Sequence, residues 1–305
     1  MTKVFIDGSA GTTGLRIADR LKERSDIELI TLPDAERKDP ERRKEAVNLA
    51  DICFLCLPDE AAKETVAMVE NPDTAVIDTS TAHRVSPDYV YGFPEITGRD
   101  RIKNSKRIAN PGCHATGFIS LIFPLVNQGI INPDARLCCF SLTGYSGGGK
   151  KMIAEYESSE RSALLGAPRQ YGLTQQHKHL KEMAAVTGLL NPPVFCPVVG
   201  DFYSGMEVTV TLNKSDFKAS LSEIKEVYKS FYTGRVVSFS DEQEEGFLSA
   251  GILSGKDGLT VSAFGNDDRI ILVSRFDNLG KGASGAAVQN MNIVMGIDET
   301  EGLVL

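Results

Sequence analysis

A glycine-rich turn near the N-terminus restricts the possible folds of this chain more than any other feature. A short apolar strand is predicted over residues 3–7, and the sequence Gly-Ser-Ala-Gly-Thr-Thr-Gly follows at positions 8–14. An amphipathic helix and a second strand at 27–32 come next. This order is typical of a mononucleotide-binding unit, in which backbone N–H groups meet a pyrophosphate at the helix N-terminus. The spacing here is G-x-x-G-x-x-G rather than the commoner G-x-G-x-x-G. A turn with a purely structural role is therefore the alternative interpretation.

Alternating elements continue after the turn. Helices are predicted over 39–50 and 59–70, and strands over 52–57 and 74–78. This alternation predicts a parallel sheet with helices on both faces, and such sheets bind ligands at the carboxyl ends of their strands. The predicted cofactor-binding residues of this part are Gly8, Ser9, Gly11, Thr12, Thr13, Gly14, Arg37, Lys38, Leu57, Pro58 and Ser80.

Cys113 is the strongest candidate nucleophile. It follows Asn110-Pro111-Gly112 and precedes an apolar run over 118–126, which predicts a helix that ends at Gly129. A thiol at a helix N-terminus, with an ordinary pKa of about 8.5, is shifted toward thiolate. The short strand at 107–109 brings the cysteine to the sheet edge where the cofactor is expected. The alternative is a free cysteine packed in a core.

The other cysteines are interpreted as core residues. Cys53 and Cys56 have the spacing of a redox or metal pair, but residues i and i+3 of one strand face opposite sides, so the two sulfurs cannot share a metal. Cys138 and Cys139 are also assigned to the core. Six cysteines in 305 residues are too few for a disulfide framework.

Two of the four histidines, His177 and His179, precede Glu182. A thiolate nucleophile needs a partner that exchanges protons near neutral pH, which is a histidine role. Metal binding by the two is disfavoured because no third ligand is evident, so no metal site is predicted. In an extended or turn segment the two rings would point to opposite sides. We expect His177 to donate the proton beside Tyr171, and Glu182 to anchor His179. His83 and His114 are predicted at the surface.

The sequence beyond residue 130 predicts a second domain. Strands at 206–212, 235–239, 259–263 and 269–276 and a helix near 216–230 indicate a mostly antiparallel α+β layer. A further strand at 137–142 leads into a loop rich in glycine at 143–150, which suits either an anion-binding loop or a flexible hairpin. The final helix has small residues at its start, so we expect it to pack back onto the first domain. The predicted domains are 1–112 with 283–305, and 113–282.

Charge and hydropathy exclude several function classes. The net charge is −8, and the basic residues between Arg37 and Lys44 are interrupted by acidic ones, as on a solvated helix face. This composition argues against a nucleic-acid partner. No apolar run approaches the roughly 18 residues of a membrane span, and no signal-like segment opens the chain. We therefore expect a cytoplasmic protein with a small-molecule substrate.

Three motifs make the chain similar to the N-acetyl-gamma-glutamyl-phosphate reductase family, in its shorter variant, over nearly the full length. Asn110 to Cys113 with Thr116-Gly117 resembles the nucleophile motif of the family. The sequence from His177 to Glu182 resembles its H-x-H-x-x-E, and residues 277–292 resemble its D-N-L-x-K-G-A…Q-N-M-N segment. The chain departs from the family at His114, where Tyr is common, and in an extra glycine after Tyr145.

The resemblance implies a Rossmann-like dinucleotide-binding domain plus an α+β catalytic and dimerisation domain, as in aspartate-semialdehyde dehydrogenase. It implies NADPH-dependent reduction of N-acetylglutamyl phosphate through a Cys113 thioester in arginine biosynthesis, by a homo-oligomer (dimer or tetramer). The resemblance also implies that Asn278 and Gly280 bind the cofactor. The catalytic residues that it implies are Cys113, His177 and His179. The implied substrate-binding residues are Asn110, Ser146, Gly147, Lys150, Tyr171 and Glu182, and the substrate carboxylate would meet Lys150, Arg161 or Arg169.

Alternatives remain open at the level of the sequence. Aspartate-semialdehyde dehydrogenase or another acyl-phosphate reductase would share the chemistry, whereas a dinucleotide-binding regulator would keep the glycine turn without the cysteine and histidine pair. The cofactor could also be NAD, because Asp34 lies where an acid binds the ribose 2′-hydroxyl. Arg37 and Lys38 follow within reach of a 2′-phosphate, which with the family resemblance favours NADPH.

Overall fold

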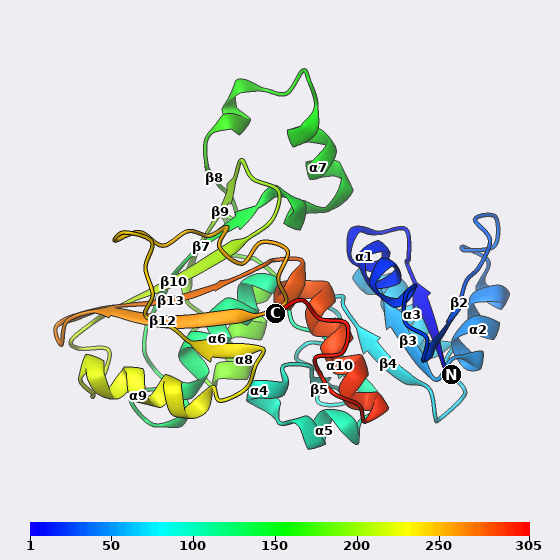
Figure 1. The fold of residues 1–305 in the computed structure, drawn as a ribbon, viewed down its shortest axis with the longest axis horizontal. Coiled ribbons are helices and arrows are strands. Elements are labelled where there is room, and N and C mark those ends of the chain that lie inside the picture. The colour runs from blue at the N-terminus through cyan, green and yellow to red at the C-terminus, as the bar shows by residue number, and fades with distance from the viewer. The chain divides into compact units, whose positions relative to one another are not determined.

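The computed structural model describes all residues from 1 to 305. The chain divides into two compact units, which are coloured along the sequence in Figure 1. Unit 1 comprises Met1–Pro111 and Ala283–Leu303, and unit 2 comprises Gly112–Gly282 and Val304–Leu305. None of the helices has the length and hydrophobicity needed to span a membrane.

Unit 1 is built on a six-stranded sheet in the order β2-β1-β3-β4-β6-β5, and all of its strand pairs are parallel. The strands are β1 (Thr2–Asp7), β2 (Ile27–Ile30), β3 (Ile52–Leu55), β4 (Ala75–Asp78), β5 (Val90–Tyr91) and β6 (Arg107–Ala109). The helices are α1 (Thr12–Leu21), α2 (Pro40–Leu49), α3 (Asp59–Ala67), α4 (Pro94–Thr97), α5 (Arg99–Lys103) and α10 (Gly285–Met295). The predicted parallel sheet is confirmed.

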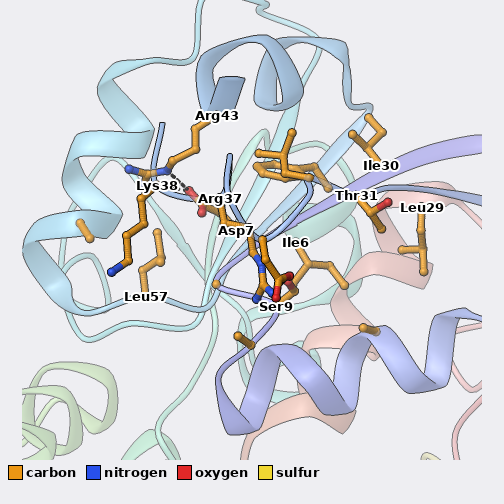
Figure 2. Close-up of a pocket in the computed structure, with 17 residues that line it drawn as sticks. Ile6, Asp7, Ser9, Leu29, Ile30, Thr31, Arg37, Lys38, Arg43 and Leu57 are labelled. Carbon is orange, nitrogen blue, oxygen red and sulfur yellow. Dashed lines mark hydrogen bonds and ion pairs between the residues drawn. The ribbon is translucent and has the colours of Figure 1, made fainter. Parts of the chain in front are cut away.

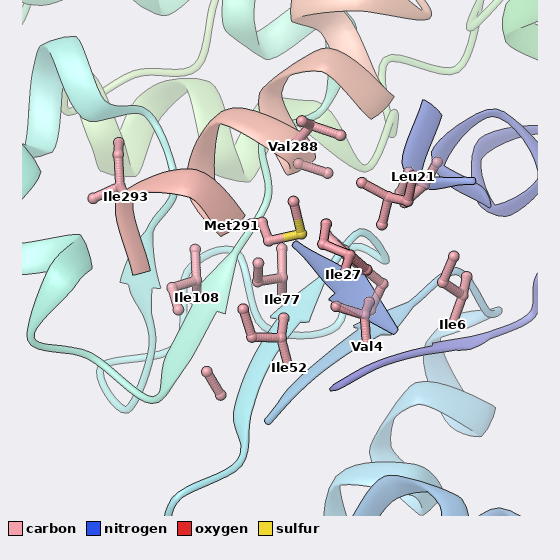
Figure 3. Close-up of a cluster of buried hydrophobic side chains, with 14 of the residues drawn as sticks. Val4, Ile6, Leu21, Ile27, Ile52, Ile77, Ile108, Val288, Met291 and Ile293 are labelled. Carbon is pink, nitrogen blue, oxygen red and sulfur yellow. The ribbon is translucent and has the colours of Figure 1, made fainter. Parts of the chain in front are cut away.

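Helices cover both faces of this sheet because alternate strand residues point to opposite sides. On one face, Val4 and Ile52 pack with residues of α10 such as Met291, as Figure 3 shows. On the other face, Phe5 packs with residues of α2 and α3. Cys56 belongs to the first cluster and Cys53 to the second, so the prediction that these two thiols face opposite sides is confirmed.

Unit 2 is built on a seven-stranded sheet in the order β11-β12-β13-β10-β7-β9-β8. Its strands are β7 (Cys138–Gly144), β8 (Arg169–Gln170), β9 (Val194–Gly200), β10 (Met206–Asn213), β11 (Val237–Phe239), β12 (Leu259–Gly265) and β13 (Arg269–Phe276). Its helices are α6 (Cys113–Asn127), α7 (Gly149–Glu157), α8 (His179–Thr187) and α9 (Leu221–Phe231). Four of the six pairs are antiparallel, and β7 with β9 and β11 with β12 are parallel, as expected for an α+β layer.

Helix α6 lies at the centre of the core of unit 2. Most of its residues are buried, and Gly117 approaches β10 so closely that a Cβ there would lie 2.3 Å from a methyl group of Val208. Tyr228 and Tyr232 of the α9 region donate hydrogen bonds of 2.7 Å to the carbonyls of Leu121 and Ser120. The helix that begins with Cys113 is therefore held along its length by the surrounding core.

Two segments differ in form from the sequence expectation. The glycine-rich stretch after β7 is a 3-10 turn at Tyr145–Gly148 that continues into α7, so it is not a flexible hairpin, and its anion-binding role stays a prediction. The C-terminal helix α10 is preceded by a π-helical turn at Gly280–Ser284.

Candidate active site

Cys113 is the first residue of α6, and Gly112 is its N-cap with an extended backbone. The thiol is partly exposed. At this position the helix dipole favours the thiolate. The local geometry therefore fits the predicted nucleophile.

The remaining cysteines are in environments that favour the thiol. Burial raises the pKa of Cys53 and Cys139 well above the usual value and raises the pKa of Cys56 to about 12. Partial burial and the neighbouring Cys196 also raise the pKa of Cys138. Cys138 is exposed, so its assignment to the core was wrong: successive residues of β7 face opposite sides of the sheet, and Cys138 lies on the exposed side while Cys139 lies on the buried side.

Three histidines of unit 2 form one cluster. The ring centroids of His177 and His179 are 4.7 Å apart, and each lies 5.6 Å from the ring of His114. The expectation that His177 and His179 point to opposite sides is therefore wrong. The segment turns into α8 between them, so the period of an extended strand does not apply.

The hydrogen bonds of His177 indicate where its proton lies. The backbone N–H of His179 donates to Nδ1 of His177 at 3.2 Å. A ring nitrogen that accepts a hydrogen bond is unprotonated in neutral imidazole, so the proton is on Nε2. His177 thus presents an Nε2–H donor.

His114 is buried rather than at the surface, which corrects the sequence expectation. Its Nδ1 is 2.7 Å from Oγ of Ser141, and its Nε2 is 2.7 Å from the hydroxyl of Tyr171. Burial, with a smaller contribution from His177, lowers the pKa of His114 to about 3. Burial and the neighbouring Cys113 raise the pKa of Tyr171. Both side chains are therefore neutral hydrogen-bonding groups near the nucleophile.

His114 is expected to make the protein less stable in acid. The unfolded chain takes up a proton below about pH 6.5, whereas the native chain does so only near pH 3, so stability falls as the pH falls through this window. In His114→Gln, the loss of unfolding free energy between about pH 7.5 and about pH 5 should be smaller by about 2 kcal/mol. Urea titrations of both proteins at the two pH values would measure this, and equal losses would contradict the assignment.

Glu182 lies against the backbone before the nucleophile. Its buried Oε1 accepts a hydrogen bond of 2.8 Å from the N–H of Gly112. This contact differs from the predicted role of Glu182, which was to anchor His179 or to bind the substrate. Tyr171 lies beside His177, with ring centroids 6.2 Å apart, as expected.

Gly282 packs directly on the nucleophile. A Cβ at this position would lie 2.9 Å from Cβ of Cys113 and 3.1 Å from the carbonyl oxygen of Asp277. Gly282→Ala should therefore displace Cys113 and lower kcat by at least about tenfold. Gly166→Ala, where nothing lies within 4 Å of the added Cβ, is the matched control. Unchanged steady-state kinetics of Gly282→Ala would count against this packing.

Several predicted substrate and cofactor residues have structural roles in unit 2. The side chain of Asn278 accepts from the N–H of Gly205 and donates to Oγ of the buried Ser146. A Cβ on Gly280 would lie 2.0 Å from the carbonyl oxygen of Lys256. Asn278, Ser146 and Gly280 are therefore engaged in contacts within unit 2.

The three candidates for the substrate carboxylate differ in their surroundings. Arg161 donates two hydrogen bonds of 2.7 Å to the carboxylate of Asp201, so its guanidinium already has an acidic partner within the protein. Lys150 in α7 and Arg169 in β8 are exposed, as is Gly147. Lys150 and Arg169 are therefore the better candidates.

A cavity of about 430 Å³ lies in unit 1 at the ends of β1 and β2, and Figure 2 shows its lining. The chain turns there at Gly8, which has φ of +87°. Only glycine fits this position, because a Cβ would lie 2.3 Å from the carbonyl oxygen of Cys56. The predicted residues that line the cavity are Gly8, Ser9, Arg37, Lys38 and Leu57. Those that do not line it are Gly11, Thr12, Thr13, Gly14, Pro58 and Ser80.

Arg43 and Asp7 also line the cavity, although no sequence pattern marks them as binding residues. The buried guanidinium of Arg43 donates to Oδ2 of Asp7 at 2.9 Å, and Oγ1 of Thr65 donates to the same oxygen at 2.7 Å. Figure 2 shows Arg43 directed at Asp7. Arg43 is thus not part of a solvated helix face. A glycine turn beside a cavity with Arg37 and Lys38 at its rim fits a phosphorylated dinucleotide.

Comparisons with known proteins agree with this architecture. Residues 3–105 match the family model of the semialdehyde dehydrogenase NAD-binding domain, and residues 113–278 match that of the semialdehyde dehydrogenase dimerisation domain. The N-acetyl-gamma-glutamyl-phosphate reductase 2 of Nostoc sp. is 43% identical over 318 aligned positions, with 99% of each chain covered. The N-acetyl-gamma-glutamyl-phosphate reductase of Brucella suis is 44% identical over 306 positions, with 96% of this chain and 99% of the relative covered.

The chain belongs to the N-acetyl-gamma-glutamyl-phosphate reductase family. The family resemblance predicted from the sequence is therefore confirmed. Solved structures show the same fold at low sequence identity. The aspartate semialdehyde dehydrogenase II of Vibrio cholerae has a TM-score of 0.72 at 17% identity, with 97% of this chain and 98% of that chain covered. A probable aspartate-semialdehyde dehydrogenase from Pseudomonas aeruginosa has a TM-score of 0.73 at 14% identity, with 96% and 98% covered.

Proposed function

We propose that this protein reduces N-acetylglutamyl 5-phosphate to N-acetylglutamate 5-semialdehyde with NADPH, as a step of arginine biosynthesis. The observation that carries the proposal is the partly exposed Cys113 at the start of α6, in the same unit as the histidine cluster. The names of the relatives supply the substrate. The sequence-based prediction of a cytoplasmic location stays a prediction.

The chemistry assigned to the chain begins at the sulfur. The Cys113 thiolate attacks the acyl carbon, a C–S bond forms, and the C–O bond to phosphate breaks with both electrons leaving on phosphate. NADPH, when bound, supplies the hydride that reduces the resulting thioester. When the C=O bond of the aldehyde re-forms, the C–S bond breaks and its electrons leave on the sulfur of Cys113, while Nε2–H of His177 donates a hydrogen bond to the oxygen of the collapsing hemithioacetal. Tyr171 and His114 remain neutral and orient the histidine cluster.

Arg37 and Lys38 are assigned to the 2′-phosphate of NADPH. Both line the cavity of unit 1, and Arg37 is held by an ion pair with Asp34. Replacing both cations by Ala should lower kcat/KM for NADPH by about tenfold or more and leave that for NADH within about twofold, because only NADPH carries the 2′-phosphate. Arg42→Ala, which removes an exposed ion-paired arginine outside the cavity, is the control. A wild-type kcat/KM ratio of NADPH to NADH at or below one would contradict the assignment.

A homo-oligomer is also proposed, a dimer or tetramer. Residues 113–278 match a dimerisation domain. The register aligns Ile271, Thr211, Cys138 and Val194 in one row across β13, β10, β7 and β9, and all four are exposed. Such a row fits a face that a second copy covers. Light scattering during gel filtration would give the mass of the assembly, and a monomer at micromolar concentration would contradict the proposal.

The test of the proposed function uses the reverse reaction. Reduction of NADP⁺ is followed with N-acetylglutamate semialdehyde or with aspartate semialdehyde, each with and without inorganic phosphate. The proposal requires phosphate-dependent reduction with the N-acetylated substrate and at most weak reduction with the other. Preference for aspartate semialdehyde would make the chain an aspartate-semialdehyde dehydrogenase. No reduction with either substrate would favour a dinucleotide-binding regulator.

A further inference from the structure

Three side chains of unit 2 form a hydrogen-bonded network around the ring of His114. Nδ1 of His114 is 2.7 Å from Oγ of Ser141, and Nε2 is 2.7 Å from the hydroxyl of Tyr171. His114 and Ser141 are buried, and the exposed fraction of Ser141 is 0%. Each hydroxyl has one proton, and so has the neutral imidazole. The direction of every hydrogen bond in the His114 network therefore follows from the donors and acceptors that are present.

Ser141 determines which nitrogen of His114 is protonated. Nδ1 of His114 is the hydrogen-bond partner of its hydroxyl. If Nδ1 donated to Oγ, the hydroxyl proton of Ser141 would be buried without an acceptor, and such groups are rare because they are costly. Ser141 therefore donates to Nδ1. Burial lowers the pKa of His114 to about 3 and so keeps the ring neutral, which means that its single proton is on Nε2.

This tautomer leaves the proton of Tyr171 available to another acceptor. Nε2–H of His114 donates to the oxygen of Tyr171, so the phenolic O–H is directed away from the imidazole. Burial and, as a smaller effect, the charge of Cys113 raise the pKa of Tyr171. The second effect requires the thiolate of Cys113 to lie within electrostatic range of this hydroxyl. The sulfur is therefore the charged acceptor in the surroundings of the free O–H.

The backbone holds Tyr171 in a fixed place beside this cluster. Its N–H donates to the carbonyl oxygen of Pro197 in β9 at 3.0 Å. Its ring centroid is 6.1 Å from that of His114 and 6.2 Å from that of His177. His179 lies against both histidines, so the titratable groups around the hydroxyl are Cys113 and the three histidines. None of these groups is a carboxylate that would compete with the sulfur for the proton.

We propose that His114 is a positioning residue that makes Tyr171 a hydrogen-bond donor to the sulfur of Cys113. The proton stays on the tyrosine oxygen, and the hydrogen bond stabilises the thiolate before it attacks and again when the C–S bond breaks. Ser141 acts one step further away, because it selects the tautomer of His114. This inference rests on the proposed function of Cys113 as nucleophile.

A double-mutant cycle of His114→Leu and Tyr171→Phe tests the proposal. The pH profile of Cys113 alkylation by iodoacetamide gives the pKa of the thiol without substrate, and kcat/KM is measured with acyl phosphate and NADPH. Tyr171→Phe removes the donor, so it should raise the pKa of Cys113 by about 1 and lower kcat/KM by at least about tenfold. His114→Leu should cause similar changes when Tyr171 is present. In the Tyr171→Phe protein it should change kcat/KM by at most about twofold further.

Two buried serines of unit 2 provide a matched pair of variants. Ser120 on α6 donates its hydroxyl to the carbonyl of Gly117 at 2.8 Å and lies outside the His114 network. Ser141→Ala should lower kcat/KM by about threefold or more, because the ring of His114 then adopts both tautomers. Ser120→Ala should leave kcat/KM within about twofold of the wild type. If His114→Leu does not fold, Ser141→Ala replaces it in the cycle with Tyr171→Phe.

The outcomes separate a failure of this inference from a failure of the proposed function. If His114→Leu lowers kcat/KM by the same factor with and without the hydroxyl of Tyr171, its role is structural only and the proposal is overturned. An alkylation profile that Tyr171→Phe leaves unchanged would also overturn it. A wild-type protein whose Cys113 alkylation depends on Tyr171 and His114 as expected, but which reduces no acyl phosphate, would instead refute the proposed function.

Discussion

Cys113→Ser is expected to abolish turnover. A serine at the start of α6 has the same position but is far from ionised near neutral pH, so the acyl carbon meets no competent nucleophile. The expected loss in kcat is at least about 10⁴-fold. Single-turnover and steady-state assays of the variant with acyl phosphate and NADPH would measure it, and melting curves would show that the fold is intact.

Cys138→Ser is the matched control for this substitution. Cys138 is also exposed and is also in unit 2, but burial and Cys196 raise its pKa. We expect wild-type kinetics from it, and alkylation of the wild-type protein should modify Cys113 first among the six cysteines. Inactivation by modification of another cysteine, while Cys113 stays free, would refute the assignment of the nucleophile.

His177→Asn is expected to have the second largest effect, a decrease in kcat of roughly a hundredfold or more. The proton on Nε2 of His177 is fixed by the hydrogen bond that Nδ1 accepts from the N–H of His179. Asparagine can keep a hydrogen bond to that N–H through its amide oxygen, but its shorter side chain cannot place a donor where Nε2–H lies. The expected size is that of removing one hydrogen-bond donor to a developing oxyanion.

The variant His179→Asn distinguishes the role of His179 from that of His177. It should lower kcat/KM less, and mainly by raising KM through weaker substrate binding, since His179 begins α8 beside His177. Profiles of kcat against pH for both variants provide the measurement. The roles would be reversed if His179→Asn removed the acidic or basic limb of the profile while His177→Asn kept it.

The sequence predicted those features that repeat locally. The parallel sheet of unit 1 follows from short apolar strands that alternate with helices, and the start of α6 follows from a glycine, a cysteine and an apolar run. Both patterns are complete within about twenty residues. The α+β character of unit 2 was visible in the same way, from strands of alternating burial such as β10.

The features that were missed depend on contacts between distant residues. His114 is buried because Ser141 and Tyr171, which are 27 and 57 residues away, satisfy both of its ring nitrogens. Arg43 is buried because Asp7, 36 residues away, accepts its guanidinium. Glu182 meets the N–H of Gly112 across 70 residues. No periodicity along the chain marks such partners, so a polar residue in an exposed-looking stretch was assigned to the surface.

The most direct test of the central claim is to trap the acyl group on the protein. The protein is mixed with N-acetylglutamyl phosphate without NADPH, quenched in acid and digested, and the peptides are measured by mass spectrometry. The proposed reaction predicts an N-acetylglutamyl group on the peptide that contains Cys113, its release by hydroxylamine, and its absence from Cys113→Ser. An acyl group on another residue, or acyl phosphate turnover in Cys113→Ser, would contradict it.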